Sequence, residues 1–247
     1  MQATLRFLGT GDAFGSGGRF QTCFLLRVDG LACLIDCGAS APLALRRENI
    51  RQPDVTHVVV SHLHGDHIGG IPFLLLDAAY ADERTSPLTI AGPPGLADTV
   101  TRLLDLLYPG SARKVLSRVP HRFLELSPRA ETDLNGVRVQ AIPVQHGSDI
   151  VAFGLRVGVD GSVVAYSGDT EWTPALPELS RDADLFICEC VSWDVPVPSH
   201  LTHAQLAAHA AEFGARRMVL THLGPEMLRH SHEARWTCAA DGMSVTL

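Results

Sequence analysis

Short apolar runs recur along the whole chain, and most of them are rich in valine, isoleucine and leucine. Runs of about four to eight such residues, bounded by glycine, proline or polar residues, are typical of β-strands. The pattern predicts strands at 4–8, 22–28, 32–35, 55–60, 88–91, 137–142, 153–157, 162–166, 185–189, 217–221 and 243–247. Helical spacing is seen near 42–49, 68–79, 95–107 and 204–213.

The alternation of these elements predicts two sheets covered by helices, which is a layered α/β fold. Asp29-Gly30 favours a hairpin between two neighbouring strands, and such hairpins argue against a simple doubly wound sheet. Thr202 and Gln205 fit a capping box at the start of the last helix, and Gly214 follows as a stop signal. We expect the helices at 95–107 and 204–213 to occupy similar places in two halves of the chain.

Composition limits the classes of protein that the chain can represent. With 247 residues, 46% of them apolar, it can bury the core of one domain or of two tightly joined halves. The net charge of −7 argues against a surface coated with basic residues for nucleic acid. No apolar run approaches the roughly 20 residues that span a bilayer. Residues 1–7 lack the layout of a signal peptide, so we expect a cytoplasmic protein.

The six cysteines are expected to be reduced thiols, most of them buried. Cys188 and Cys190 lie two residues apart on one face of a predicted strand, where a mutual disulfide has poor geometry.

A dense group of metal-binding residue types follows the apolar run Val58–Val60. The segment 61–67 reads Ser-His-Leu-His-Gly-Asp-His. On an extended chain His62 and His64 point the same way, whereas Asp66 and His67 follow the turn glycine and can face a second ion. Imidazole and carboxylate ligands suit zinc, and manganese or iron also accept them. The segment therefore predicts two divalent metal ions.

Four further polar residues follow predicted strands: Asp36, His146, Asp169 and His222. A single histidine or aspartate at a strand end is most often a cap or a turn residue. Here several of them accompany the histidine-rich motif, and strand ends are where layered α/β proteins build their sites. The combination favours one shared site.

With these residues the chain resembles the metallo-β-lactamase superfamily and, within it, the ribonuclease Z-like phosphodiesterase branch. His62-x-His64-x-Asp66-His67 matches the superfamily signature, and the later histidines and aspartate match in order. The resemblance implies an αββα four-layer sandwich, with residues 1–247 forming a single domain of two similar halves. It implies one metal on His62, His64 and His146, a second on Asp66, His67 and His222, a bridging Asp169 and a supporting Asp36.

Two more segments resemble that branch, in which a glutamate orients a histidine. Cys188-Glu189-Cys190-Val191 stands where the branch has His-Glu-Ala-Thr, and His200-Leu201-Thr202 stands where it has His-Ser-Thr. Glu189 points away from its two cysteine neighbours, so it can face the site. The alternative is that Glu189 pairs with an arginine and that His200 is a loop residue.

The implied chemistry is that of a phosphodiesterase with a metal-bridged hydroxide as nucleophile. Asp66 would orient that hydroxide, and His200, held by Glu189, would protonate the departing alkoxide. Little more than one hairpin separates His146 from Asp169, which leaves no room for the arm that grips tRNA in this branch. A small phosphodiester or a short nucleic acid is therefore the expected substrate.

Two other functions remain open. One is hydrolysis of a lactone, thioester or other acyl substrate, which activity on lactones without activity on diesters would support. The other is a non-hydrolytic role in cofactor biosynthesis or metal-dependent binding, which an absence of turnover at full metal loading would support. A homodimer is expected from the family alone.

Some further residues carry weaker expectations. The glycine-rich run 9–18 is expected to flank the metal cleft. Arg19 and Phe20 at its end either anchor the loop or contact substrate. His203 and His209 accompany the helix that follows His200, and we predict that they are structural or exposed. The other histidines are predicted to lie at the surface: His57, His121, His230 and His232.

Overall fold

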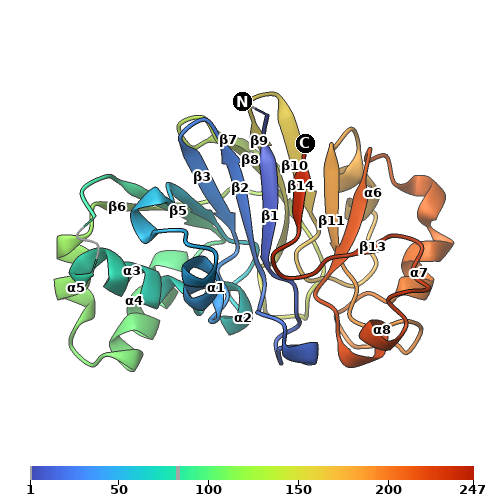
Figure 1. Cartoon of the computed structure of the whole chain (residues 1–247), viewed down its shortest axis with the longest axis horizontal. Coiled ribbons are helices and arrows are strands. Elements are labelled where there is room, and N and C mark those ends of the chain that lie inside the picture. The colour runs from blue at the N-terminus through green and yellow to red at the C-terminus, as the bar shows by residue number, and fades with distance from the viewer. Residues whose placement is uncertain (1, 82–83) are drawn as a thin grey trace.

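The computed structural model describes residues 2–81 and 84–247, and among them two sheets form the centre of the molecule (Figure 1). The first has the strand order β14-β1-β2-β3-β4-β5-β6. Its strands are β1 (Thr4–Gly9), β2 (Cys23–Val28), β3 (Leu31–Ile35), β4 (His57–Val59), β5 (Leu88–Gly92), β6 (His121–Glu125) and β14 (Ser244–Thr246). The second has the order β13-β12-β11-β10-β9-β8-β7. Its strands are β7 (Glu131–Asp133), β8 (Arg138–Pro143), β9 (Phe153–Val159), β10 (Ser162–Tyr166), β11 (Leu185–Glu189), β12 (Met218–Thr221) and β13 (Thr237–Cys238).

Helices cover the outer face of each sheet. Those on the first sheet are α1 (Ala41–Arg47), α2 (Gly65–Ile68), α3 (Ile71–Tyr80), α4 (Leu96–Leu107) and α5 (Ala112–Arg118). Those on the second are α6 (Ala175–Ser180), α7 (His203–Ala208) and α8 (Pro225–Arg229). Short 3-10 turns add η1 (Ser16–Gly18), η2 (Gln52–Asp54) and η3 (Ala210–Glu212).

Alternation along the strands produces three buried apolar layers. On β3, Leu34 packs toward the first helices, whereas Cys33 and Ile35 pack between the sheets. On β11, Ile187 faces the other sheet and Phe186 faces the second group of helices. Central strands such as β3, β5 and β11 bury both faces, so their sequences are almost wholly apolar. The predicted four-layer αββα sandwich is thereby confirmed.

The two sheets share a pairing pattern. Antiparallel pairs join β1-β2-β3 and β8-β9-β10, and parallel pairs continue through β3-β4-β5-β6 and β10-β11-β12-β13. This similarity supports the proposal of one domain built of two similar halves. Helix α4 connects β5 with β6, so its counterpart is α8 between β12 and β13. The expected equivalence of the helices at 95–107 and 204–213 is therefore wrong, since α7 follows β11.

The helix predicted at 204–213 is shorter than its pattern suggested. Its start is confirmed, because the Thr202 hydroxyl accepts from Gln205 N at 3.1 Å and the Gln205 amide oxygen accepts from Thr202 N at 3.0 Å. Helix α7 ends at Ala208, where His209 leaves helical geometry, and η3 follows. The His209 ring stacks on Trp172 with a centroid distance of 3.6 Å, a tertiary contact that sequence spacing does not contain.

Short elements account for most of the other differences. Helices α5, α6 and α8 and strands β6, β7 and β13 were not predicted, because two to seven residues carry too little periodicity. His57, expected at the surface, is buried, and its Nε2 lies 2.5 Å from the Leu134 carbonyl oxygen. Strand β4 lies inside its sheet, so even its first residue is covered. All six cysteines are unpaired, as predicted.

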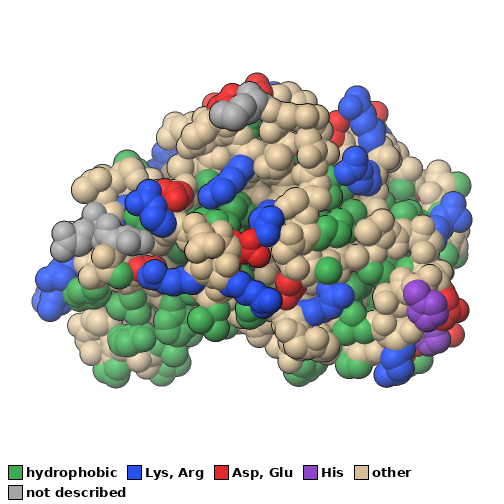
Figure 2. All heavy atoms as spheres, viewed as in Figure 1, with side chains coloured by type: hydrophobic (Ala, Val, Ile, Leu, Met, Phe, Trp, Pro, Cys, Tyr) green, Lys and Arg blue, Asp and Glu red, His purple; other side chains and the backbone are tan. Residues whose placement is uncertain are grey.

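Hydrophobic side chains gather on the surface over the helices of the first sheet (Figure 2). Leu106 is 78% exposed and Leu107 43% at the end of α4, and Phe73 of α3 and Tyr108 are also exposed. The rings of Phe73 and Tyr108 meet edge to face at 6.3 Å. In residues 2–81 and 84–247, no helix combines the length and hydropathy needed to cross a membrane.

Candidate metal centre

The histidine-rich segment leaves the end of β4 and turns at once into helix α2. The backbone N–H groups of His67 and Ile68 both donate to the His64 carbonyl at 3.0 Å, which fixes this tight turn. Asp36, at the end of the neighbouring β3, accepts from Ser61 N at 2.7 Å. Asp36 has a left-handed φ of 56°, a conformation that aspartate tolerates better than most residues. The ends of two adjacent strands are thus locked together beneath the motif.

Three imidazoles form the first group of converging side chains. His62 Nε2 and His146 Nε2 each lie 3.1 Å from His64 Nδ1. The other ring nitrogens are engaged, since His62 Nδ1 lies 3.1 Å from Ser61 Oγ and His146 Nδ1 donates to the Ser199 carbonyl at 3.0 Å. Four ligands around zinc would stand roughly 3.3 Å apart. The three nitrogens are therefore spaced as ligands of one ion.

Two carboxylates and two imidazoles form a second group beside the first. Asp169 Oδ2 lies 3.3 Å from His67 Nε2 and 3.3 Å from His222 Nε2. His67 Nε2 is also 3.2 Å from Asp66 Oδ2. The same Asp169 oxygen lies 3.9 Å from His62 Nε2 in the first group. Asp169 therefore stands between the two groups, as a bridging ligand would.

Hydrogen bonds from the outside fix the orientation of the imidazoles in the second group. Asp36 Oδ2 accepts from His67 Nδ1 at 2.7 Å and from Ser61 Oγ at 2.8 Å. His222 Nδ1 lies 3.2 Å from the Thr22 hydroxyl. A partner on one ring nitrogen sets the tautomer and leaves the other nitrogen for a metal. In both rings Nε2 is the nitrogen left to face the site.

The protonation of these imidazoles follows from burial and from neighbouring charges. Burial, followed by repulsion from nearby imidazoles, lowers the pKa of His62 and of His64, which favours the neutral form that binds metal. Burial also opposes the charged form of His67, but Asp169 and Asp36 outweigh it and raise its pKa well above the usual value. Binding of a metal at His67 would therefore displace a proton.

These residues fit divalent metal ions. His67 Nε2 and Asp169 Oδ1 are buried without a hydrogen-bond partner, and such groups are costly in a fold unless a ligand satisfies them. Ligand-capable atoms within 4.8 Å of one another define three groups in the part of the chain that the structure describes. They are His62 with His64 and His146, then Asp66 with His67, Asp169 and His222, and finally His146 with Asp169 and His200.

The predicted pair of Glu189 and His200 is formed at the rim of these groups, and no arginine takes the place of His200. Glu189 Oε1 accepts from His200 Nδ1 at 3.0 Å and from Thr170 N at 2.7 Å, and Oε2 accepts from Leu201 N at 3.2 Å. Its own N–H donates to Ser167 Oγ at 2.9 Å. One buried carboxylate thus joins the His200 loop to the turn that carries Asp169.

His200 faces the ligand groups with its ring. Its centroid lies 5.1 Å from that of His146 and 5.5 Å from that of His222. Burial alone would lower its pKa, but the hydrogen bond and charge of Glu189, with smaller contributions from the site aspartates, raise the pKa to about 9. The structure brings His200 beside His146, Asp169 and His222, and its role as proton donor stays a prediction.

Several residues that hold this site were missed by the sequence reasoning. Ser61 and Thr22 orient imidazoles, Ser199 does so through its carbonyl, and Thr170 accepts from Gln145 N at 3.1 Å next to His146. Serine and threonine beside a ligand motif are a weak signal. Only the fold shows which of them reach a ring nitrogen.

The glycine-rich loop flanks the site, and Arg19 anchors it. One guanidinium nitrogen of Arg19 donates to Thr10 Oγ1 and to the Ala239 carbonyl oxygen, at 2.6 Å in each case. Phe20 N donates to Asp241 at 2.7 Å. The Thr10 carbonyl in turn accepts from Leu223 N, which follows His222. Of the two expectations for Arg19, loop anchoring is the one that these contacts support.

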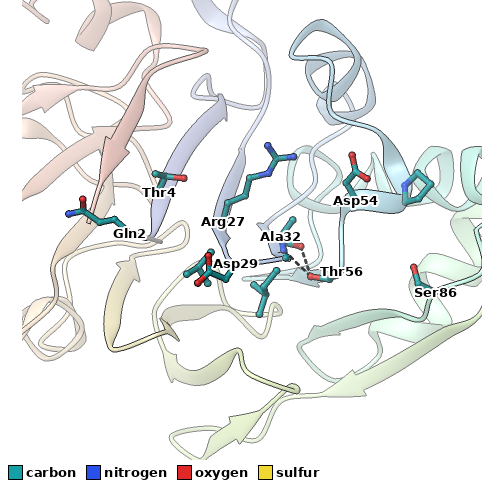
Figure 3. A pocket seen from close by; sticks show the side chains of 12 residues that line it. Gln2, Thr4, Arg27, Asp29, Ala32, Asp54, Thr56 and Ser86 are labelled. Carbon is teal, nitrogen blue, oxygen red and sulfur yellow. Dashed lines mark hydrogen bonds between the residues drawn. The ribbon is translucent and has the colours of Figure 1, made fainter.

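A pocket lies away from the histidines, at the opposite end of the strands (Figure 3). It has a volume of about 740 Å³ and is lined in part by Thr4, Arg27, Asp54 and Thr56. Thr56 precedes β4, so this hollow adjoins the amino end of a strand whose carboxyl end leads to the histidines. Sites in such sheets form at the carboxyl ends of the strands. The hollow therefore is separate from the candidate metal centre.

Comparisons with known proteins agree with this geometry. A family model described as anti-Pycsar protein Apyc1 matches residues 3–239. The chain is 26% identical to a ribonuclease Z of Lachnoclostridium phytofermentans, and the match covers 90% of this chain and 88% of the relative.

Solved structures show the same architecture. Human tRNase Z, short form, superimposes with a TM-score of 0.78 at 26% identity and covers 98% of each chain. The metallo-β-lactamase fold protein YhfI of Bacillus subtilis superimposes with a TM-score of 0.78 at 18% identity, covering 99% of this chain and 100% of the other. The second likeness concerns the fold alone.

Proposed function

The chain belongs to the family of the anti-Pycsar protein Apyc1, and we propose that it hydrolyses a small phosphodiester with the help of two divalent metal ions. It is a metal-dependent hydrolase of the ribonuclease Z-like branch of the metallo-β-lactamase superfamily, as its motifs predicted. The observation that carries the proposal is the meeting of two ligand groups with the Glu189–His200 pair at one edge of the sandwich.

The proposed ligands divide as the geometry groups them. His62, His64 and His146 would hold one ion, Asp66, His67 and His222 the other, and Asp169 both. When bound, the ions would supply an activated water and neutralise charge on the phosphoryl oxygens. Five imidazoles and two carboxylates favour zinc, although manganese or iron also accept such a set.

The chain's own residues would provide the proton chemistry. Asp66 lies at the second group and would accept a hydrogen bond from the attacking water, which orients it. His200 would donate a proton from Nε2 to the departing alkoxide, because Glu189 holds its Nδ1 and favours its protonated form. An alkoxide is a poor leaving group, so a phosphodiester needs this donor more than an acyl substrate does.

The substrate is proposed to be small. The connection between His146 and Asp169 consists of the hairpin of β9 and β10, with no inserted arm to hold a folded RNA. Cyclic nucleotides, short nucleic-acid ends and small phosphodiester metabolites are the candidates. The net charge of −7 also argues against a broad electrostatic surface for polyanions.

The test is hydrolysis of bis(p-nitrophenyl) phosphate by metal-loaded protein beside its His64→Ala variant. We expect turnover by the former and a loss of turnover with a loss of bound metal in the latter. Turnover of lactones or thioesters without any diester activity would replace the proposal by acyl hydrolysis. A fully metal-loaded protein without turnover of either class would indicate a binding role.

We further propose a homodimer that uses the exposed apolar side chains of α3 and α4, which Figure 2 shows gathered on one surface. Contiguous exposed apolar patches mark interaction sites in soluble proteins. Sedimentation velocity should give a dimer for the protein and a monomer for Leu106→Asp. The control Phe14→Asp changes a more exposed side chain elsewhere and should leave the dimer intact. Six unpaired thiols support the proposed cytoplasmic location.

A further inference from the structure

The hydroxyl of Tyr166 is buried between the two sheets and has no hydrogen-bond partner among the described residues. Tyr166 is the last residue of β10, three residues before Asp169, and its side chain is wholly buried. Its ring packs edge to face against Phe24 of β2, in the opposite sheet, at a centroid distance of 5.2 Å. A hydroxyl that is buried without a partner is costly in a fold, so its retention needs a reason.

Four carboxylates of the candidate metal centre act on this hydroxyl. Burial raises the pKa of Tyr166 well above its usual value, and the charges of Asp36, Asp169, Glu189 and Asp66 raise it further. The hydroxyl therefore keeps its proton and can donate a hydrogen bond to a carboxylate oxygen.

Two of these carboxylates already have donors on both oxygens. Asp36 accepts from Ser61 N through Oδ1 and from Ser61 Oγ through Oδ2. Glu189 accepts from His200 through Oε1 and from Leu201 N through Oε2. Neither carboxylate depends on Tyr166 for a donor.

The bridging aspartate is the carboxylate that lacks one. Its oxygen Oδ2 faces Nε2 of His67 and of His222, each at 3.3 Å. Its other oxygen, Asp169 Oδ1, is buried and has no hydrogen-bond partner in the part of the chain that the structure describes. The Asp66 side chain is 10% exposed and the Asp169 side chain 2%, so water can satisfy Asp66 far more easily. The Tyr166 hydroxyl and Asp169 Oδ1 are thus a buried donor and a buried acceptor of complementary chemistry.

We propose that Tyr166 is a positioning residue of the metal centre, whose hydroxyl donates to Asp169 Oδ1 and so directs Oδ2 toward both ions. The inference rests on the proposed two-metal centre and adds to it a residue outside its ligand set. Hydrogen bonds to ligating carboxylates fix their orientation, and losing such a support typically costs about 10- to 100-fold in metal affinity or activity. Because the tyrosine is neutral, it can orient Asp169 without neutralising the charge that the ions require.

The test is Tyr166→Phe, which keeps the ring against Phe24 and removes only the oxygen. We expect opposite effects on the two forms of the protein. After treatment with EDTA, Tm should rise by roughly 2–4 °C, because a buried hydroxyl without a partner is gone. Zinc affinity, measured by competition with a chromophoric chelator, should fall roughly 10- to 100-fold. A fixed zinc concentration should therefore raise Tm less in the variant than in the unsubstituted protein.

Ser111→Ala is the matched control. The Ser111 hydroxyl, at the start of α5, is also buried without a partner among the described residues, and it lies outside the ligand groups. Its removal should change Tm equally with and without zinc and should leave zinc affinity unchanged. If Tyr166→Phe lowers Tm equally in both forms, or leaves zinc affinity unchanged, the tyrosine has only a packing role and the inference is wrong.

A pH–rate profile separates Asp169 from Glu189 as the partner of the hydroxyl. With the pKa of His200 raised to about 9 by Glu189, the alkaline limb of diester hydrolysis should stay in place in Tyr166→Phe. A limb that moves while zinc affinity stays the same would assign the hydroxyl to Glu189 and overturn the inference. The failures are distinguishable, because an unsubstituted protein without tight zinc sites overturns the proposed metal centre itself. Two tight sites of equal affinity in Tyr166→Phe overturn only the role of Tyr166.

Discussion

Two carboxylate–imidazole pairs border the ligand groups, one held by a carboxylate from each sheet. Asp36, after β3, holds Nδ1 of His67 at 2.7 Å, and Glu189, at the end of β11, holds Nδ1 of His200 at 3.0 Å. The His67 side chain is wholly buried, with Nε2 near two more carboxylates. The His200 side chain is 19% exposed and borders a pocket.

The surroundings of Nε2 therefore decide what each pair can do. Nε2 of His67 lies 3.2 Å from Asp66 Oδ2 and 3.3 Å from Asp169 Oδ2, where a bound cation would be held. At the rim, Nε2 of His200 can reach a substrate and carry a proton to it. On our proposal the same pair of residue types would serve metal binding at His67 and proton transfer at His200, and four substitutions can separate these roles.

The largest effect is expected from His67→Ala. Without this ligand the second group loses an imidazole, so metal content should fall toward one ion per chain and diester hydrolysis by several orders of magnitude. Elemental analysis and kcat measure the two effects. His232→Ala, at a side chain 76% exposed and outside the ligand groups, is the control. Full metal content in His67→Ala would show that His67 is not needed to hold the second ion.

His200→Ala should be almost as harmful, but only for some substrates. General acid catalysis contributes about 10²- to 10⁴-fold, so a diester with an alkoxide leaving group should lose roughly that much. A p-nitrophenolate leaving group needs no proton and should lose little, with metal content unchanged. Equal losses for both leaving groups, measured as kcat, would contradict a donor role.

The two carboxylates can be compared directly in Asp36→Asn and Glu189→Gln. Substituting a residue that orients a metal ligand costs about 10- to 100-fold in metal affinity. We expect this loss for Asp36→Asn and not for Glu189→Gln. Glu189→Gln should instead alter the pH profile. With the pKa of His200 raised to about 9, activity on alkoxide diesters should decline as pH rises through that value.

Removing the charge of Glu189 lowers the pKa of His200, so the alkaline limb should move to lower pH while metal affinity remains. Titration with a chelator and pH–rate profiles distinguish the two variants. A shift of the limb in Asp36→Asn, or a metal defect in Glu189→Gln, would show that the pairs are not specialised.

The smallest effect is expected at the helix cap that follows His200. Thr202 accepts from Gln205 N at the start of α7, and Thr202→Ala should cost about 1 kcal/mol of unfolding free energy. For a chain of this size that is a fall of roughly 2–4 °C in Tm. Thr202→Ser keeps the hydroxyl and should restore the value in a thermal melt. An unchanged Tm in Thr202→Ala would mean that the cap adds little.

Local pattern was sufficient for the long strands and for the histidine-rich segment. Val58 to His67 carries an apolar strand, a turn glycine and four candidate metal-binding residues within ten residues, so its sequence contains most of its structure. His146, Asp169 and His222 lie far apart in the chain. A shared site was predicted from their places after predicted strands, and their assignment to two metals came from the family resemblance.

What the sequence could not reveal depends on tertiary contacts. The burial of His57 follows from the position of β4 inside its sheet, and the early end of α7 follows from the stacking of His209 on Trp172. The pocket beside His200 arises from two loops that are distant in sequence. The spacing of apolar residues along the chain does not predict contacts between such distant loops.

The order of strands has a consequence for dividing the gene. The chain passes from the first sheet to the second between β6 and β7, through the exposed residues 127–130, and only β14 returns, to pair with β1. A break at 127–130 would give a first fragment with six strands of the first sheet and a second fragment with the whole second sheet and β14. Neither would contain a complete set of proposed ligands. Because β14 belongs to the second fragment but completes the sheet of the first, recovery of hydrolysis on mixing would make the pair a complementation reporter.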